Sequence, residues 1–303
     1  MTEATLPQQR GLTEVLRAGG RRWGGRSTTV AARLDPRCSY CLFVPNEAVA
    51  EDFRNLLIYV HGEGRRFQYI LNALAPLAKA CNYVLVCPLF PANLLRDGNI
   101  AGYKYLREGD IRYDLVLLDI VDEVRQAFAF REPRFVLGGF SGGGQFCHRF
   151  AYFHPDQVSA LSVAAPGSVT LLDRSRSLWA GIADGETIMG RRVDVEGLRA
   201  IRLQLVVGEL DGAGDDPLPQ AVPETLPATG NVAGANRVER LRSLWGSWQD
   251  NGIPAELCVV PGARHDFRML VPSISEFFEA GVNSRPPAPL DTMGSRGLPA
   301  TQK

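Results

Sequence analysis

The stretch from Phe135 to Phe153, FVLGGFSGGGQFCHRFAYF, constrains the fold of this chain more than any other. It opens with the apolar run 135–137, which is too short for a helix and typical of a buried strand. Glycines then lie on both sides of Ser141, and phenylalanines recur afterwards at helical spacing, at positions 146, 150 and 153. We therefore predict a buried strand, a sharp turn and a helix, with Ser141 at the turn.

In this context the pattern Gly-x-Ser-x-Gly at 139–143 predicts a nucleophile elbow. A serine at such a turn sits in strained backbone, and the residues two before and two after it press against the strand and the helix. Side chains would clash there, so Gly139 and Gly143 suit the turn. The first turn of the helix also presents free N–H groups that favour an anion beside the serine. The alternative is a glycine-rich turn with an incidental serine.

Apolar runs and helical patterns alternate along the rest of the chain. This alternation predicts a mostly parallel central sheet of about eight strands with helices on both faces, a fold of the α/β class. A turn at 35–37 joins the first two predicted strands, which makes them an antiparallel hairpin at the edge. The predicted strands are 27–34, 38–44, 56–60, 83–87, 135–140, 158–165, 203–207 and 256–260. Besides the helix that follows Ser141, the predicted helices are 67–80, 113–130, 237–251 and 273–282.

We expect three parts in the chain. Residues 1–26 form a flexible N-terminal segment, with a short helix near 12–17. Residues 27–283 form one catalytic domain, in which 168–200 interrupt the alternation and are predicted to form a small lid. Residues 284–303, rich in proline and small residues, are predicted to be a disordered tail.

Composition narrows the classes of partner. The formal net charge is +0, so neither nucleic acid nor an anionic membrane is an expected partner. The N-terminus lacks the apolar core of a signal peptide, and most cysteines lie in apolar runs, so we expect a reducing, cytoplasmic setting. Cys38 and Cys41 lack a second cysteine or histidine pair, so we interpret them as packing residues rather than as a metal site or a redox pair.

Chemistry-bearing residues follow four of the predicted strands. In a parallel sheet the carboxyl ends of the strands meet at one edge, where ligands bind. The residues that follow these strands are His61-Gly62-Glu63-Gly64, Ser141, Asp211 and His265, so we expect all of them at one rim.

A serine hydroxyl becomes a useful nucleophile when a base takes its proton and a carboxylate orients that base. The chain has four histidines, which allows selection by elimination. His61 is interpreted as holding its own loop, whereas His148 and His154 lie on or just after the helix that follows Ser141. His265 alone lies in a loop after the last strand, and we predict that it is the base.

The orienting acid should follow an earlier strand. Asp211 comes a few residues after the strand that ends at 207, and we favour it for that reason. Asp215 and Asp216 are close competitors, and Glu209 is a more remote alternative. Asp266 is a sequence neighbour of the base and is poorly placed to hold its ring, so we interpret it as a residue that bonds its own loop.

Acyl transfer passes through a tetrahedral oxyanion, which needs preset N–H donors. One predicted donor is the backbone N–H of Gly142, directly after the serine. The second is predicted in the loop after the strand that ends at Val60, where the N–H of Glu63 is favoured over that of Gly64. The alternative for this loop is an ordinary strand-ending turn.

These motifs together resemble the α/β-hydrolase superfamily, over about residues 50–282. The resemblance rests on HGEG at 61–64, GFSGG at 139–143, GELD at 208–211 and ARHDF at 263–267. Within the superfamily, residues 138–161 are similar to the elbow region of polyhydroxyalkanoate depolymerase-like and feruloyl-esterase-like enzymes. This chain departs from those commonly exported enzymes in lacking an export signal, and it carries an acidic residue, Glu63, in the oxyanion loop.

The resemblance implies a serine hydrolase that needs no cofactor and cleaves carboxylic esters, or else thioesters, lactones or amides, in a small-molecule substrate. Ser141, Asp211 and His265 occur in that family's order of nucleophile, acid and base. The alternatives are a non-catalytic binding protein on the same fold, and carbon–carbon cleavage or lysis with the same triad. Candidate pocket walls come from the irregular segments 90–112 and 168–200, and are Tyr103, Tyr105, Trp179 and Ile182.

Overall fold

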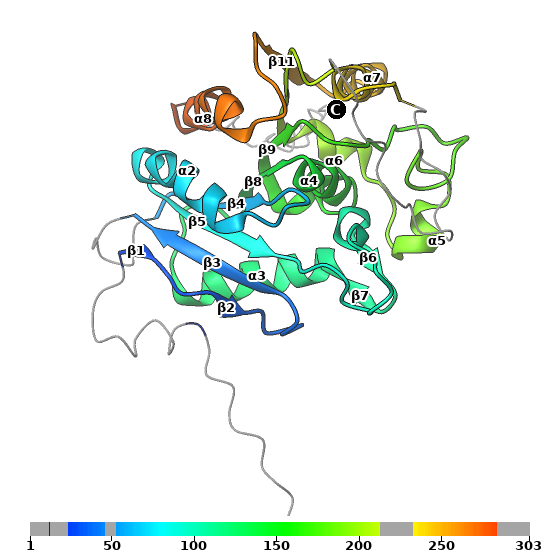
Figure 1. Ribbon diagram of the computed structural model, residues 1–303. Coiled ribbons are helices and arrows are strands. Elements are labelled where there is room, and N and C mark those ends of the chain that lie inside the picture. The colour runs from blue at the N-terminus through cyan, green and yellow to red at the C-terminus, as the bar shows by residue number, and fades with distance from the viewer. Residues whose placement is uncertain (1–11, 13–23, 46–52, 213–232, 284–303) are drawn as a thin grey trace, which may run out of the picture.

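The structure, a computed structural model, describes residues 12, 24–45, 53–212 and 233–283. Within these residues a sheet of nine strands runs through the molecule, with helices on both of its faces (Figure 1). Its strands are β1 (Gly25–Arg26), β2 (Val30–Ala31), β3 (Ser39–Val44), β4 (Asn55–Val60), β5 (Tyr83–Leu89), β8 (Phe135–Phe140), β9 (Val158–Ala164), β10 (Arg202–Gly208) and β11 (Ala255–Val260). This architecture confirms the predicted mostly parallel sheet.

The helices alternate with these strands as the sequence predicted. The α-helices of the described residues are α2 (Phe67–Cys81), α3 (Tyr113–Ala127), α4 (Gly142–Phe153), α5 (Gly185–Met189), α6 (Val195–Arg199), α7 (Arg237–Asp250) and α8 (Phe267–Asn283). The described residues also contain two 3-10 helices, η1 (Gly102–Tyr105) and η2 (Pro155–Gln157). A separate hairpin is formed by β6 (Arg107–Glu108) and β7 (Ile111–Arg112).

The sheet has the strand order β1-β3-β5-β4-β8-β9-β10-β11, and β2 also pairs with β3. All pairings from β5 to β11 are parallel, whereas β3 is antiparallel to β5 and to its two short partners. Every residue of β4 is buried, as expected for a central parallel strand covered on both faces. The carboxyl ends of β4, β8, β10 and β11 therefore lie along one edge.

Consecutive residues of a strand point to opposite faces, so Gly138 and Gly139 show which helix covers which face. A Cβ atom on Gly138 would lie 3.4 Å from Cζ of Phe278 in α8, whereas one on Gly139 would lie 2.8 Å from Sγ of Cys147 in α4. Helix α2 packs beside α8 (Figure 1). Helices α2 and α8 thus cover one face, and α4 covers the other.

Some predicted boundaries were wrong. β5 continues through Pro88 to Leu89 instead of ending at Pro88, because β3 pairs with it as far as Leu89; the pairing on its other side, with β4, ends at Val86, and a proline is tolerated where a strand has a partner on one side only. The hairpin strand predicted at 27–34 is only the two-residue β2, and Gly25–Arg26, assigned to the flexible segment, pairs with β3. Helix α8 begins at Phe267 rather than at 273.

The apolar residues 238, 241, 244, 245 and 248 recur at helical spacing in α7, which predicts one inward face, but the structure confirms this only in part. Trp248 is buried and donates its Nε1–H to the hydroxyl of Tyr152 at 2.9 Å, which ties α7 to α4. Trp245 is 37% exposed and donates to the carbonyl of Ala255 instead. The indole N–H needs an acceptor, and the adjacent edge strand β11 offers one.

The segment 168–200 contains two short helices, α5 and α6, connected by turns. Its role as a lid stays a prediction, as does the division into domains. The predictions for 1–11, 13–23 and 284–303 lie outside the described residues.

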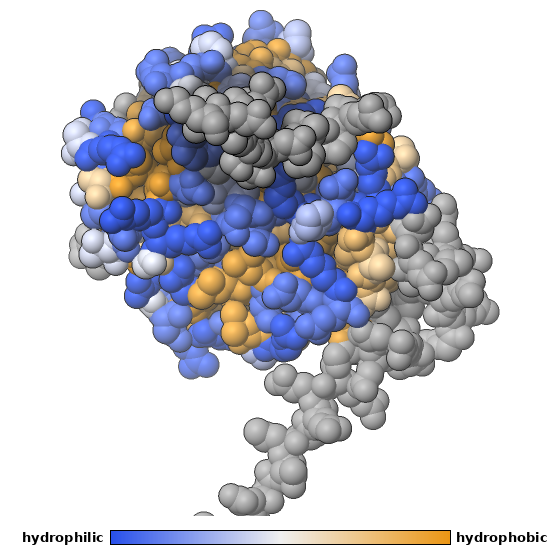
Figure 2. Space-filling model, turned by 180° about the vertical axis from the view of Figure 1, so that it is seen from behind, coloured by the Kyte–Doolittle hydropathy of each residue, from blue (hydrophilic) through white to orange (hydrophobic). Residues whose placement is uncertain are grey.

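Seen from behind, the molecule carries separate hydrophobic areas among hydrophilic ones (Figure 2). Among the described helices, none combines the length and the apolar character that crossing a membrane requires.

Candidate active site

Ser141 lies at the turn between β8 and α4, in a backbone conformation that side chains rarely adopt, with φ 56° and ψ −113°. Its N–H donates to the carbonyl of Ala164 at 2.8 Å, which fixes the turn to the neighbouring strand β9. The flanking glycines are sterically required. A Cβ atom on Gly139 would lie 2.3 Å from the carbonyl oxygen of Gly143, and one on Gly143 would lie 2.1 Å from the carbonyl oxygen of Val60.

His265 lies in the loop after β11 and reaches this serine. Its Nε2 atom is 3.1 Å from Oγ of Ser141, and its Nδ1 atom is 2.7 Å from Oδ2 of Asp211. The carboxylate can only accept, so Nδ1 carries the proton and Nε2 is left to accept from the serine hydroxyl. The imidazole also stacks on the ring of Phe140, with 4.7 Å between ring centroids, which fixes its plane.

Asp211 follows β10 and is buried except for 7% of its surface. Its Oδ2 atom accepts from His265, and its Oδ1 atom accepts from Nη1 of Arg237 at 3.3 Å, at the start of α7. A buried carboxylate needs such partners, because an unpaired charge is costly away from water. The two contacts leave Asp211 with one oxygen directed at the imidazole and the other held by a cation.

The loops after β10 and β11 are joined by their own hydrogen bonds. The N–H groups of Glu209 and Leu210 donate to the carbonyls of Val260 and Ala263, and the Glu209 carboxylate accepts from the N–H of Gly262. Glu209, the remote alternative for the acid, therefore bonds the neighbouring loop rather than His265. These bonds bring together the two strand ends that carry Asp211 and His265.

The other acidic candidates have separate positions. Asp266 accepts from the N–H of Arg268 at 3.0 Å and so bonds the start of α8, in line with its predicted local role. Asp215 and Asp216 lie outside the described residues.

The loop after β4 lies beside the serine. Gly62 is close enough that a Cβ atom on it would be 3.3 Å from Cβ of Ser141. Among the described residues, neither the N–H of Glu63 nor that of Gly142 donates a hydrogen bond to another group of the protein. These two N–H groups are the oxyanion donors that the sequence predicted, one directly after Ser141 and one in the loop after β4, and their binding of a substrate oxygen stays a prediction.

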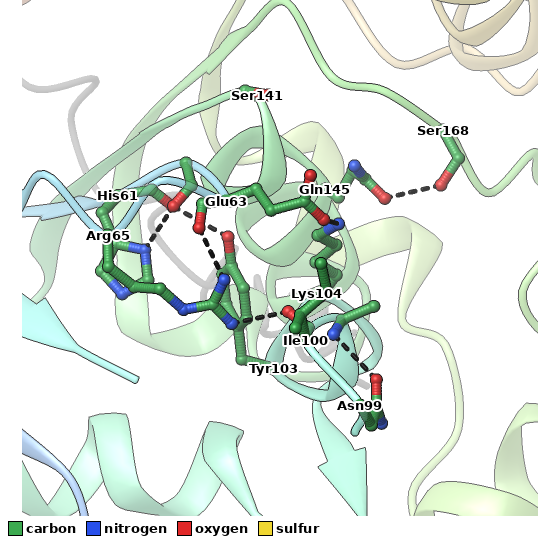
Figure 3. A network of polar contacts seen from close by, with 12 residues as sticks. His61, Glu63, Arg65, Asn99, Ile100, Tyr103, Lys104, Ser141, Gln145 and Ser168 are labelled. Atoms are coloured by element: carbon green, nitrogen blue, oxygen red, sulfur yellow. Dashed lines mark hydrogen bonds and ion pairs between the residues drawn. The ribbon is translucent and has the colours of Figure 1, made fainter. Parts of the chain in front are cut away.

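The acidic side chain in this loop does not stand alone. The Glu63 carboxylate forms a hydrogen-bonded ion pair with the ammonium group of Lys104 in η1 (Figure 3). The carbonyl of Glu63 accepts from Nη1 of Arg65 at 2.6 Å. Lys104 was not found from the sequence, because a single lysine in an irregular loop is ordinarily solvated. Arg237 was missed because an arginine at the start of a helix is ordinarily solvated as well.

Of the three remaining histidines, His61 and His148 bond backbone groups and His154 bonds side chains. His61 bonds the carbonyl of Gly62 through Nδ1 and accepts from the N–H of Phe90 through Nε2, and burial lowers its pKa to about 4. His148 bonds the carbonyl of Gly144 and the N–H of Thr170 in the same manner, and burial lowers its pKa to about 3. His154 bonds the carboxylate of Asp114 at 2.9 Å.

The predicted wall residues are packed inside the protein. Tyr105 and Trp179 contact each other edge to face with 5.6 Å between ring centroids, Tyr103 contacts His61 with tilted rings 5.0 Å apart, and Ile182 is buried as well. Their contact with a substrate stays a prediction.

A cavity of about 370 Å³ lies at the other end of the strands, among the first residues of β4, β8, β9 and β10. It lies away from the serine, since the triad residues follow the carboxyl ends. Arginines around it donate to carbonyls that end helices, as Arg54 does to Val282 and Arg199 does to Asn251. This cavity is therefore not a pocket of the candidate site.

The fold and the candidate site together identify the fold class of this protein. A mostly parallel sheet in this strand order, with a strained serine between a strand and a helix on its carboxyl edge, is the α/β-hydrolase fold. The prediction of this fold from the motifs is confirmed.

Solved structures share this architecture at low sequence identity. LpqC, a poly(3-hydroxybutyrate) depolymerase from Bordetella parapertussis, aligns with a TM-score of 0.70 and 19% identity over 91% of this chain and 96% of its own. Poly(aspartic acid) hydrolase-1 from Sphingomonas sp. KT-1 aligns with a TM-score of 0.63 and 20% identity over 79% and 92%. A ferulic acid esterase aligns with a TM-score of 0.57 and 13% identity over 85% and 99%. No protein-family model matches the sequence, and the search of curated proteins gave no match.

Proposed function

We propose that this protein is a serine hydrolase that cleaves a carboxylic ester through an acyl-enzyme. The observation that carries the proposal is the hydrogen-bonded chain Ser141–His265–Asp211, with 3.1 Å and 2.7 Å between the bonded atoms, on a strained strand-to-helix turn. A base within hydrogen-bond distance of a hydroxyl, itself oriented by a carboxylate, is the arrangement that makes a serine nucleophilic.

In the first step Oγ of Ser141 attacks the ester carbonyl while Nε2 of His265 takes the hydroxyl proton. The imidazolium is stabilised by the buried carboxylate of Asp211, which keeps the ring in the required tautomer. The carbonyl oxygen becomes an oxyanion, and the N–H groups of Glu63 and Gly142 are its donors. Each such donor lowers the barrier by about 3 kcal/mol.

The tetrahedral intermediate then collapses and the alcohol leaves with the proton from His265. Water attacks the acyl-enzyme on Ser141, with His265 acting again as base, and the acid is released. Apart from the ester and the water molecule, these steps use only side chains and backbone groups of this chain.

The substrate class is inferred from the fold's solved relatives. Two of the three named above act on esters by their names, a poly(3-hydroxybutyrate) depolymerase and a ferulic acid esterase. We therefore place carboxylic esters first, and thioesters, lactones and amides after them.

The test is turnover of p-nitrophenyl esters with acyl chains of two, four and eight carbons by the wild-type protein and Ser141→Ala. The proposal expects p-nitrophenol release by the wild type and a loss of about 10⁴-fold or more in kcat for the variant. Reversible binding of the esters without turnover would instead indicate a binding protein. Turnover confined to carbon–carbon bonds or cyanohydrins in a wider screen would indicate lyase-type chemistry on the same triad.

A further inference from the structure

Lys104 is a buried cation whose presence the proposed triad does not explain. It lies in η1, in the segment between β5 and α3, and only 6% of its side chain is exposed. An ammonium group is almost never buried unless it is paired. Its partner is the carboxylate of Glu63, whose own side chain is 49% exposed at the surface of the site. The pair thus spans from the protein interior to the loop after β4.

The side chain of Lys104 also contacts the residue after the serine. The Cε atom of Lys104 is 3.1 Å from the position that a Cβ atom on Gly142 would occupy, and the hydroxyl of Tyr103 is 2.2 Å from the same position. The helix η1 therefore packs directly against the elbow. Glu63 and Gly142 carry the two backbone donors described above, so Lys104 lies against both.

The surroundings of Lys104 are rigid. Its carbonyl accepts from Nη1 of Arg149, a fully buried guanidinium that also bonds Ser168 and Thr170. The same guanidinium packs over the ring of Tyr105, 4.8 Å from its centroid. The base of the Lys104 side chain is consequently fixed to α4, the helix that follows the serine.

Glu63 is held at two points. Arg65 donates to its backbone carbonyl and to that of Ile100, and Lys104 binds its carboxylate. A loop of glycines on either side of Glu63 has many accessible backbone conformations, so an ion pair to a fixed cation selects among them. The direction of the Glu63 N–H depends on that selection.

We propose that Lys104 is a positioning residue for the proposed hydrolysis: through its ion pair with Glu63 it holds the N–H of Glu63 toward the oxyanion. The proposal rests on the proposed function. A merely structural ion pair would affect stability and leave the chemical step unchanged, whereas a misplaced donor lowers kcat.

The first experiment compares Lys104→Met and Glu63→Gln with the double variant and with Lys79→Met, an exposed lysine on α2. Each single variant should lose about tenfold to a hundredfold in kcat, with KM within about threefold of the wild-type value. The double variant should be no slower than the slower single variant, because both changes break one interaction. Lys79→Met should hydrolyse as the wild type does.

The second experiment is the alkaline pH profile of kcat. Burial lowers the pKa of Lys104, and the Glu63 carboxylate opposes that shift, whereas Arg65 and Arg149, the other charged groups facing it, add to it. The ammonium should thus lose its proton earlier than an ordinary lysine, so kcat should fall on the alkaline side. Lys104→Arg should keep most of the wild-type kcat, which Lys104→Met loses. It should also move the alkaline fall in kcat to higher pH, since a guanidinium keeps its charge.

The outcomes distinguish a failure of the proposed ester hydrolysis from a failure of the positioning role of Lys104. Absence of ester turnover by the wild-type protein removes the proposed function and this proposal with it. Wild-type turnover together with an unchanged kcat and a lowered Tm in Lys104→Met overturns the positioning role alone. A change confined to KM, or additive losses in the double variant, would also overturn it. If Lys104→Met does not fold, Glu63→Gln alone carries the comparison of kcat and Lys104→Arg carries the shift of the pH profile; an unchanged kcat in Glu63→Gln then overturns the positioning role.

Discussion

The Nε2 atom of His265 lies 3.1 Å from Oγ of Ser141, although 124 residues separate them in the sequence. Two loops at the carboxyl edge of one sheet make this contact possible. The contact is the basis of the proposed chemistry, and most of the following tests address it or the fold that holds it.

Replacing His265 by alanine removes the proposed base and should lower kcat by about 10⁴-fold, as the loss of a triad base does elsewhere. The matched control is Asp266→Asn, whose amide oxygen can still accept from the N–H of Arg268. Steady-state hydrolysis of p-nitrophenyl butyrate gives kcat for both variants. Comparable losses of kcat in the two variants would show that activity depends on the structure of the loop and not on the imidazole.

Asp211→Asn should lower kcat by about 10⁴-fold with little change in KM, because the amide can donate and so favours the wrong tautomer of His265. Glu209→Gln is the control, since its amide oxygen keeps the acceptor for the N–H of Gly262. The same hydrolysis assay compares kcat of the two variants. An Asp211→Asn variant with wild-type kcat would indicate that Asp215 or Asp216 is the acid.

Gly143→Ala should destabilise the protein by more than about 2 kcal/mol and abolish activity, since its Cβ atom would lie 2.1 Å from the Val60 carbonyl oxygen in a packed elbow. Gly246→Ala is the matched control. Apart from the backbone of α7 itself and the two neighbouring residues, no atom of the described residues lies within 4 Å of its Cβ position, so this variant should gain about 0.5–1 kcal/mol from helix propensity. Urea unfolding of both variants gives the comparison, and equal stabilities would contradict the described packing.

The buried histidines predict sensitivity to acid. The pKa of His61 falls from 6.5 to about 4, so the unfolded chain binds its proton at a higher pH than the folded protein does. The free energy of unfolding should therefore fall as the pH drops from about 6.5 to about 4, by about 3 kcal/mol for this residue. His148 should add a similar loss that extends to about pH 3. Both effects are absent above pH 7.

Urea unfolding at pH 7.5, 5.5 and 4.5 measures this dependence. His61→Gln lacks the titrating ring, so its free energy of unfolding should change less between these pH values than that of the wild type, whatever its stability at pH 7.5. An equally steep dependence in the variant would mean that His61 is not held neutral in the folded protein.

The sequence could predict the features that depend on local pattern. The buried strands are continuous apolar runs, and glycines at 139 and 143 are the residues that the elbow's contacts require. The rule that parallel strands share a carboxyl edge then placed Ser141, Asp211 and His265 at one rim. Each of these inferences needed only spacing and residue type.

Features that depend on tertiary contacts were not predictable. Nothing near Lys104 in the sequence marks it as buried, because its partner Glu63 lies 41 residues away. Trp245 fits the apolar stripe of α7, yet the edge strand offers its indole a carbonyl and leaves it exposed. Pro88 has the local character of a strand end, yet β3 pairs with β5 past it, as far as Leu89.

The most direct test of the central claim is the mass of the protein after treatment with a fluorophosphonate, which reacts with an activated serine. The account predicts one adduct per wild-type chain, located by peptide mapping on Ser141, slow labelling of His265→Ala and no adduct on Ser141→Ala. An unlabelled wild-type protein, or an adduct that persists in Ser141→Ala, would contradict it.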